Sequence, residues 1–192
     1  MSTAETSNRK RLFDLLKTLS YENRDVVLAS GSASNEYVDC KQTALHPEGA
    51  KVLGAELFSL CEAIEAQVGQ MGLGVGGMAI GADPLATATS LAAYDRGRHL
   101  PAYLVRKEPK SHGTQEYLEG LKNIPAGANV LMVEDVVTTG GSTLKAVERV
   151  RASGLNPIGV AVIIDREVGG MTNLKEQGLF AQALFKLSDF RE

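Results

Sequence analysis

The chain has 192 residues, of which 44% are hydrophobic and 22% charged, and its formal net charge is −3. This length suits one domain with its own core, and the hydrophobic content excludes a disordered chain. The slightly acidic balance disfavours a protein that binds nucleic acid through its bulk charge.

The cysteines and the N-terminus bear on where the protein works. Cys40 and Cys61 are the two cysteines, and they lack metal-ligand spacing such as C-x-x-C, so we expect free thiols in a reducing compartment. Residues 1–11 are polar and lack the apolar segment of a secretory signal. No apolar run approaches the roughly 20 residues of a membrane span. We therefore expect a soluble, cytoplasmic protein.

The N-terminal part predicts a helix followed by a hairpin. Four leucines at helical spacing indicate an amphipathic helix over residues 8–19: Leu12, Leu15, Leu16 and Leu19. Residues 25–30 and 36–41 have the pattern of two short strands, and the small polar residues between them favour a turn.

From residue 47 onward, helices and buried strands alternate. Pro47 indicates the start of a long helix, because its missing N–H costs nothing at the first helical position. Further helices are expected up to about Arg96 and from about Ser142, and strands at residues 73–80, 102–105, 129–133, 158–164 and 180–187. Continuous apolar strands favour a parallel sheet covered on both faces. The sequence therefore predicts a doubly wound α/β fold, mainly a parallel sheet flanked by helices, in a single domain.

The most informative stretch runs from Val130 to Thr143 and reads V-L-M-V-E-D-V-V-T-T-G-G-S-T. A buried strand leads into two adjacent acids, Glu134 and Asp135, which are followed by a loop rich in glycine and hydroxyl groups and then by a helix. Ligands of open parallel sheets bind beyond the carboxyl ends of the strands, and a helix N-terminus favours phosphate. Ionised carboxylates only accept hydrogen bonds, so the two acids suit the hydroxyl groups of a ribose ring.

This stretch is neither a P-loop nor a dinucleotide-binding fingerprint. It resembles the phosphoribosyl pyrophosphate (PRPP) motif of type I phosphoribosyltransferases. The resemblance implies the fold of that family, in which residues 1–45 form a small hood over a core of about residues 46–192. It assigns the ribose 5-phosphate part of PRPP to a continuous set of residues: Glu134, Asp135, Val136, Val137, Thr138, Thr139, Gly140, Gly141 and Ser142. The alternative is an acidic turn that binds no ligand.

A basic segment follows the strand expected at residues 102–105. Its pattern R-K-x-x-K-x-H-G resembles the mobile loop of orotate phosphoribosyltransferases. The resemblance assigns Lys107 a catalytic role beside Glu134 and Asp135, and it assigns four side chains to the pyrophosphate of PRPP: Arg106, Lys107, Lys110 and His112. Closure of a cationic loop would also exclude water from a ring cation. The alternative is an ordinary solvated loop.

Arg166 follows the strand expected at residues 158–164. An arginine at a carboxyl strand end can bind a carboxylate with two parallel hydrogen bonds, and orotate carries a carboxylate that purine bases lack. The resemblance places Arg166 on orotate, with Thr138 beside it, and residues 37–41 in a hairpin that helps to cover the base. The alternative for Arg166 is a surface ion pair with Glu167 or Glu134.

The resemblance implies transfer of ribose 5-phosphate from PRPP to orotate, which gives orotidine 5-phosphate and pyrophosphate in pyrimidine biosynthesis. It also implies Mg²⁺ bound mainly through PRPP, and a homodimer in which the basic loop is shared across subunits. We expect neither nucleic acid nor a membrane as a partner. Two alternatives stay open: a purine-type phosphoribosyltransferase and a non-catalytic protein that senses PRPP.

Overall fold

A six-stranded sheet forms the centre of the computed structural model, which describes residues 3–27, 33–109 and 117–191. The strand order is β5-β4-β3-β6-β7-β8, and only the short edge strand β5 runs antiparallel to its neighbour. The strands are β3 (Val75–Met78), β4 (Ala102–Val105), β5 (Leu118–Glu119), β6 (Asn129–Val137), β7 (Asn156–Asp165) and β8 (Phe180–Lys186).

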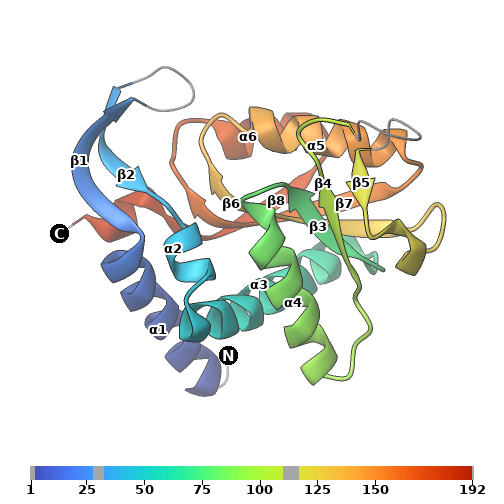
Figure 1. The fold of residues 1–192 in the computed structure, drawn as a ribbon, viewed down its shortest axis with the longest axis horizontal. Helices are drawn as coiled ribbons and strands as arrows, with labels where there is room; N and C mark the ends of the chain where they lie inside the picture. Colours follow the sequence, from blue (N-terminus) through green and yellow to red (C-terminus); the bar gives the residue numbers. More distant parts are fainter. Residues whose placement is uncertain (1–2, 28–32, 110–116, 192) are drawn as a thin grey trace.

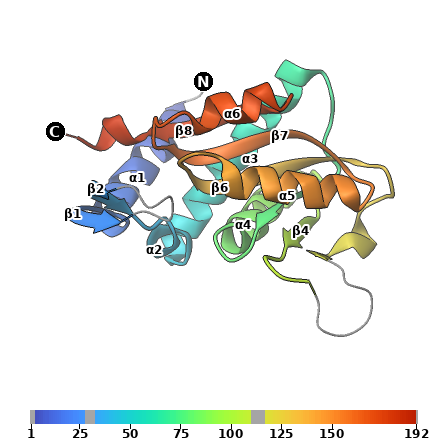
Figure 2. The same cartoon turned by 90° about the horizontal axis from the view of Figure 1, so that it is seen from above.

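Helices cover both faces of this sheet (Figures 1 and 2). On one face lie α3 (Pro47–Val68) and α4 (Ala82–Asp95), with α1 (Thr3–Leu19) beside α3; on the other lie α5 (Gly141–Ala152) and α6 (Gly170–Glu176). The mainly parallel sheet between two helical layers confirms the predicted α/β class.

The apolar run in β6 explains how the two layers are held to the sheet. Leu131 and Val133 are buried in the cluster under α3 and α4, whereas Val130 and Met132 are buried in the cluster under α5. Successive side chains of a strand point to opposite faces, so a strand covered on both sides is apolar at every position. Near the end of β6 the sides are exchanged, since Val136 packs against the cluster under α3 and α4 and Val137 is buried in the cluster under α5.

The N-terminal segment forms a separate antiparallel hairpin, β1 (Tyr21–Val27) and β2 (Ala33–Val38), which is followed by the short helix α2 (Lys41–Ala44). Figure 1 shows this hairpin standing at one end of the molecule, above α1 and α2. Both strands begin earlier than the sequence predicted. Their residues are largely polar because the hairpin is mostly exposed, so the strands lack the apolar pattern of buried ones. The expected turn at Gly31 and Ser32 lies outside the described residues.

Five short elements were not predicted: α2, β5, α6 and the two 3-10 helices η1 (Leu121–Asn123) and η2 (Leu187–Phe190). Each is too short to show a period, since the longest of them, α6, has seven residues. The expected strand at residues 129–133 is also longer in the structure. It continues to Val137 because β6 stays paired with β7 as far as Asp165.

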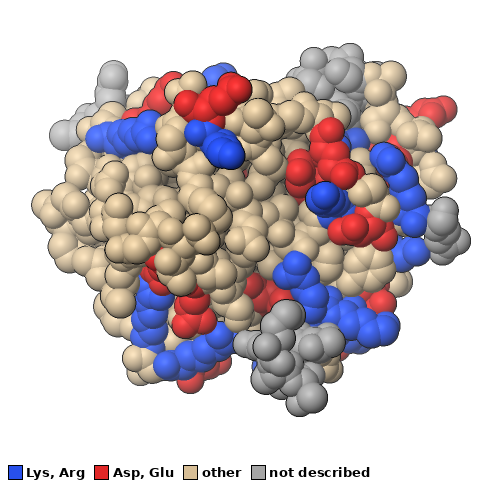
Figure 3. Space-filling model, turned by 180° about the vertical axis from the view of Figure 1, so that it is seen from behind, with Lys and Arg blue, Asp and Glu red and all other residues tan. Residues whose placement is uncertain are grey.

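The surface mixes charges of both signs. Figure 3 shows acidic and basic side chains next to each other on the face opposite to that of Figure 1, with uncharged surface between them. Within the described parts of the chain, no helix combines the length and the apolar character that crossing a membrane requires.

Gly54 generates a prediction about the contact between α3 and α4. A Cβ atom on Gly54 would lie 2.4 Å from the carbonyl oxygen of Ala88. Glycine to alanine in an exposed helix stabilises by up to about 1 kcal/mol, but here we expect Gly54→Ala to lower the free energy of unfolding by about 1–3 kcal/mol. Urea denaturation measures this, with the exposed Lys51→Ala as the control. A Gly54→Ala protein as stable as the wild type would contradict this packing.

Candidate active site

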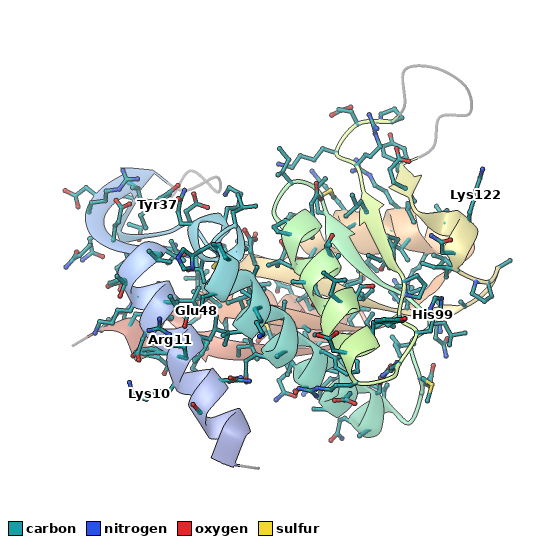
Figure 4. All side chains as sticks on the ribbon, turned by 60° about the horizontal axis from the view of Figure 1, so that its bottom comes forward. Lys10, Arg11, Tyr37, Glu48, His99 and Lys122 are labelled. Atoms are coloured by element: carbon teal, nitrogen blue, oxygen red, sulfur yellow. The ribbon has the colours of Figure 1, made fainter. Side chains whose placement is uncertain are left out.

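A cavity of about 770 Å³ opens at the edge where the carboxyl ends of β3, β6 and β7 meet, next to the end of β2. Ligands of parallel sheets bind at this edge. The lining comes from the hairpin, the ends of three strands, the basic segment and α5: Tyr37, Val38, Met78, Lys107, Glu108, Val136, Thr138, Thr139, Gly140, Gly141, Ser142, Lys145, Arg149 and Arg166. Figure 4 shows Tyr37 on the hairpin, at the same end of the molecule as α2.

The loop between β6 and α5 forms part of the cavity wall. Gly140 has a φ of 80°, a left-handed conformation that favours glycine, and it caps the start of α5. The first N–H groups of a helix have no carbonyl partner within it, and they carry the positive end of the helix dipole. The loop therefore offers several aligned donors to one anion.

Residues of helix α6 contact this loop and restrict its conformation. Asn173 donates a hydrogen bond from Nδ2 to the carbonyl oxygen of Thr139 at 2.9 Å. Gly170 packs so closely that a Cβ atom there would lie 2.5 Å from the carbonyl oxygen of Thr138. The loop is thus held at its own carbonyl groups by Asn173 and Gly170, and its N–H donors belong to the backbone.

Helix α5 adds two cations that the sequence reasoning missed. Ser142, Lys145 and Arg149 line the cavity together. Residues three and four apart share a face of a helix. That spacing, starting from the predicted Ser142, could have revealed both cations in the sequence.

Arg149 also contacts both ends of the basic segment. Its Nη1 donates to the carbonyl oxygen of Arg106 at 2.7 Å, and its guanidinium lies 4.3 Å from the centre of the Tyr117 ring. The N–H of Arg106 donates to the carbonyl oxygen of Tyr117, which joins the two ends directly. Arg149 therefore connects α5 to the two residues that flank the rest of the basic segment, Arg106 and Tyr117.

The basic segment is described as far as Pro109. Lys107 is exposed and lines the cavity, whereas Arg106 forms an ion pair with Glu119 at 3.2 Å and is not part of the lining. Lys110 and His112 lie outside the described residues.

The two adjacent acids lie within β6, close to its end, and their carboxyl groups are near enough to act on each other. Asp135 lies against Gly81, where a Cβ atom would be 2.9 Å from Oδ2. Glu134 is buried and accepts a hydrogen bond from Thr143 Oγ1 at 2.8 Å. Burial, with a contribution from the Asp135 charge, raises the pKa of Glu134 to about 8. Glu134 thus prefers its neutral form at pH 7, which differs from the expected pair of ionised acceptors.

Arg166 lies just beyond β7, on the cavity wall, and is 7% exposed. Its Nη2 donates to Ser34 Oγ at 3.0 Å and to the carbonyl oxygen of Glu36 at 3.1 Å, both on the hairpin. Burial lowers the pKa of the guanidinium. Among the residues that the structure describes, Arg166 forms no ion pair, and Glu167 instead accepts a hydrogen bond from the N–H of Ser188. The alternative of a surface ion pair is therefore wrong.

Comparison with known proteins agrees with this geometry. The model of the phosphoribosyl transferase domain family matches residues 83–176. An orotate phosphoribosyltransferase of Sorangium cellulosum is 43% identical over 196 residues, which cover 99% of this chain and 96% of that protein. The chain belongs to the orotate phosphoribosyltransferase family.

Solved structures of this family have the same fold. A crystal structure of orotate phosphoribosyltransferase from Mycobacterium tuberculosis is 35% identical, with a TM-score of 0.79, and the match covers 96% of this chain and 99% of that one. A structure of the same enzyme in complex with PRPP has a TM-score of 0.75 at 33% identity, covering 95% of this chain and 98% of that one. The type I phosphoribosyltransferase fold that the sequence implied is therefore confirmed.

Most residues of the predicted site gather around one cavity. Its lining contains Lys107, Arg166 and most of the predicted loop, whereas Arg106, Glu134, Asp135 and Val137 lie next to it without lining it. The predicted roles of these residues stay predictions, because geometry alone shows where a side chain lies.

The raised pKa of Glu134 predicts a stability that depends on pH. The folded protein holds this proton more tightly than the unfolded chain, whose glutamates titrate near 4.5, so Glu134 reduces stability progressively as the pH rises from about 4.5 to about 8. Glu134→Gln removes this loss and keeps an acceptor for Thr143. We expect the variant to equal the wild type in melting temperature near pH 4.5, and to exceed it at pH 8.5.

Glu108→Gln is the matched control for this titration, because Glu108 is an exposed glutamate at the wall of the same cavity. Its melting temperature should follow that of the wild type across the range. A constant difference between Glu134→Gln and the wild type at all pH values would show that Glu134 does not titrate as described.

Proposed function

We propose that this chain transfers ribose 5-phosphate from PRPP to orotate, with the phosphate loop and Arg166 holding the two substrates at opposite sides of one cavity. The observation that carries this proposal is Arg166, a buried guanidinium on the cavity wall that donates hydrogen bonds to two neutral oxygens, Ser34 Oγ and the carbonyl oxygen of Glu36. Such a group can bind a carboxylate through its remaining N–H donors. Membership of the orotate phosphoribosyltransferase family supports the same reaction. The reaction is a step of pyrimidine biosynthesis.

The reaction is a displacement at the anomeric carbon of ribose. The C–O bond to pyrophosphate breaks with its electron pair leaving on oxygen, a C–N bond to the base forms, and the ring nitrogen of the base gives up its proton. The transition state has oxocarbenium character. Catalysis then consists of positioning and electrostatic stabilisation, and no covalent intermediate is needed.

Each part of the cavity has a role in this proposal. The loop Thr138–Ser142 binds the 5-phosphate, and Asp135 and Glu134 bind the ribose hydroxyl groups, with a neutral Glu134 able to donate as well as accept. The departing pyrophosphate is neutralised by Arg106, Lys107, Lys110 and His112, as the family resemblance implies. We add Lys145 and Arg149, because both cations line the cavity from α5.

Magnesium fits this cavity as an ion carried by the substrate. Within the described ranges, no group of three or more His, Cys, Asp or Glu side chains could hold a metal ion. Mg²⁺ prefers phosphate oxygens and water to an all-protein site, and when bound it would supply charge neutralisation at the pyrophosphate. We therefore propose that Mg²⁺ binds mainly through PRPP.

The two alternatives make different demands on the cavity. A purine-type enzyme has no carboxylate on its base, so it has no use for a buried arginine at this position. A protein that only senses PRPP has no need of either a base site or Lys107 in the cavity wall. We also propose a cytoplasmic location, because the two cysteines are buried free thiols, which suit a reducing compartment.

An assay of orotate consumption tests the function. With PRPP and Mg²⁺, we expect the ultraviolet absorbance of orotate to fall, while adenine, hypoxanthine and uracil are not consumed. Lys107→Ala should lower kcat by roughly 100-fold or more, because a donor aimed at developing charge is removed. Arg166→Gln should raise the KM for orotate by roughly 10–100-fold, the effect of losing a hydrogen bond to a charged group. Lys122→Ala should leave both constants unchanged.

Lys122 is a suitable control because it is an exposed lysine that does not line the cavity, and Figure 4 shows it pointing into solvent. Turnover of a purine would contradict the assignment of Arg166 and keep the phosphate site. Binding of PRPP without turnover of any base would favour the sensing protein.

We also propose a homodimer in which the basic loop reaches the partner's site. Support comes from large apolar side chains that are exposed on α4 and in the segments beside it: Leu45, Ile80, Leu91 and Tyr94. Exposed apolar groups that gather on one side of a monomer commonly mark a contact with another chain.

The dimer can be tested with charged substitutions on α4. We expect Leu91→Asp together with Tyr94→Asp to halve the mass measured by sedimentation equilibrium, because two charges would be buried without partners. Activity should fall with the mass if the basic loop is shared. Met71→Asp, at an exposed apolar residue between α3 and β3, should change neither. A monomeric wild type would contradict the proposal.

A further inference from the structure

Glu36 of β2 is buried, and two arginines contact it, one of them at its carboxylate. It is 7% exposed and accepts hydrogen bonds from Arg191, at 3.1 Å from Nε and 2.8 Å from Nη2. Tyr21 Oη donates to the same carboxylate at 3.0 Å. The main-chain oxygen of Glu36 accepts the hydrogen bond from Arg166 Nη2 described above. One residue of β2 thus contacts Arg191 through its side chain and Arg166 through its backbone.

Arg191 reaches Glu36 from outside the cavity. It follows the short helix η2 (Leu187–Phe190), whose Phe190 stacks on Phe13 of α1 and on Tyr21 of β1. Arg191 lines a different hollow, of about 480 Å³, together with Lys17, Tyr21 and Glu36. Arg191 is therefore fixed by the packing of η2 and does not line the substrate cavity.

The charges of these groups act on one another. Arg191, through its hydrogen bonds, is the largest cause that holds the pKa of Glu36 below its usual value, and the charge of Arg166 contributes in the same direction. Glu36 is consequently ionised. It is close enough to Arg166 for its carboxylate to compete with a substrate carboxylate for the positive charge of Arg166. A buried carboxylate without a partner would attract the Arg166 guanidinium and repel a second carboxylate in the cavity. The ion pair with Arg191 removes most of that effect.

We propose that Arg191 is a positioning residue for the base: it neutralises Glu36, so that the guanidinium of Arg166 stays available to the carboxylate of orotate. This proposal rests on the assignment of Arg166 to orotate. It adds a residue outside the cavity that determines how well the cavity accepts an anionic base.

If Arg191 acts by neutralising Glu36, replacing both residues should raise the KM for orotate less than replacing Arg191 alone. Arg191→Gln leaves Glu36 charged and unpaired, so we expect the KM for orotate to rise about three- to tenfold, as for residues coupled in one network, while the KM for PRPP stays within about twofold. In Glu36→Gln/Arg191→Gln the charge is gone and the backbone contact to Arg166 remains. The KM for orotate should therefore return to within about twofold of the wild type.

A purely structural role predicts the opposite for the double variant. If the ion pair only ties η2 to the hairpin, removing both partners must leave the KM for orotate at least as high as in Arg191→Gln, and that result would overturn the proposal. Arg191→Lys keeps the charge and should retain a KM near that of the wild type. Because the Arg191 side chain is 57% exposed, its replacement is expected to preserve the fold, which melting curves of every variant verify.

The ion pair of Arg11 with Glu48 is the matched control. It too is formed by two hydrogen bonds, both of 2.6 Å, and Figure 4 shows it between α1 and α3, away from the hairpin. Arg11→Gln should leave the KM for orotate unchanged. Arg166→Gln separates the two proposals: if it does not raise the KM for orotate, the proposed function fails. If it does, and Arg191→Gln has no effect, only the role of Arg191 is overturned.

Discussion

The parallel pairing of β6 with β7 is the contact on which the rest of the site depends. The two strands stay in register from Asn129 and Asn156 to Val137 and Asp165, with a single shift near Val130. Because of this pairing, β6 continues beyond its apolar part through Glu134 and Asp135 to Val137. The loop proposed to bind phosphate therefore begins at a fixed position at the carboxyl end of the strand. The pairing also places Arg166, the residue after β7, beside that loop, because the N–H of Arg166 donates to the carbonyl oxygen of Val137.

Around this pair of strands, the electrostatics are arranged for a substrate with several negative charges. Lys107, Lys145, Arg149 and Arg166 contribute positive charge to the cavity wall. Two of the acids nearby, Glu134 and Glu36, reduce this positive charge only weakly. Glu134 is mostly neutral at pH 7 because burial raises its pKa, and Glu36 is paired with Arg191. An anionic ligand is thus attracted although the whole chain is slightly acidic.

A feature of this structure can be predicted from the sequence when its residues are close together in the chain, and is missed when they are far apart. The loop proposed to bind phosphate is local, so its residues could be read from one continuous stretch. The alternation of helices with continuous apolar strands identified the parallel sheet. The hairpin strands were misplaced because exposed polar strands have no apolar pattern. The pairing of Glu36 with Arg191 joins residues 155 positions apart. No spacing rule connects such residues, and the stacking of Phe190 on Phe13 and Tyr21 helps to bring them together.

The two halves of the cavity therefore differ in how they tolerate change. The proposed phosphate site is built from backbone N–H groups, and Gly170 of α6 packs against Thr138 so closely that no larger side chain fits there. The proposed base site depends on the side chain of Arg166, just beyond β7, on its contacts with β2 and, through Glu36, on the residue after η2. Replacing one side chain changes the charge at the base and leaves the phosphate loop as it is. A fold of this kind can keep one common substrate, PRPP, while the choice of base rests on a few interactions between distant parts of the chain.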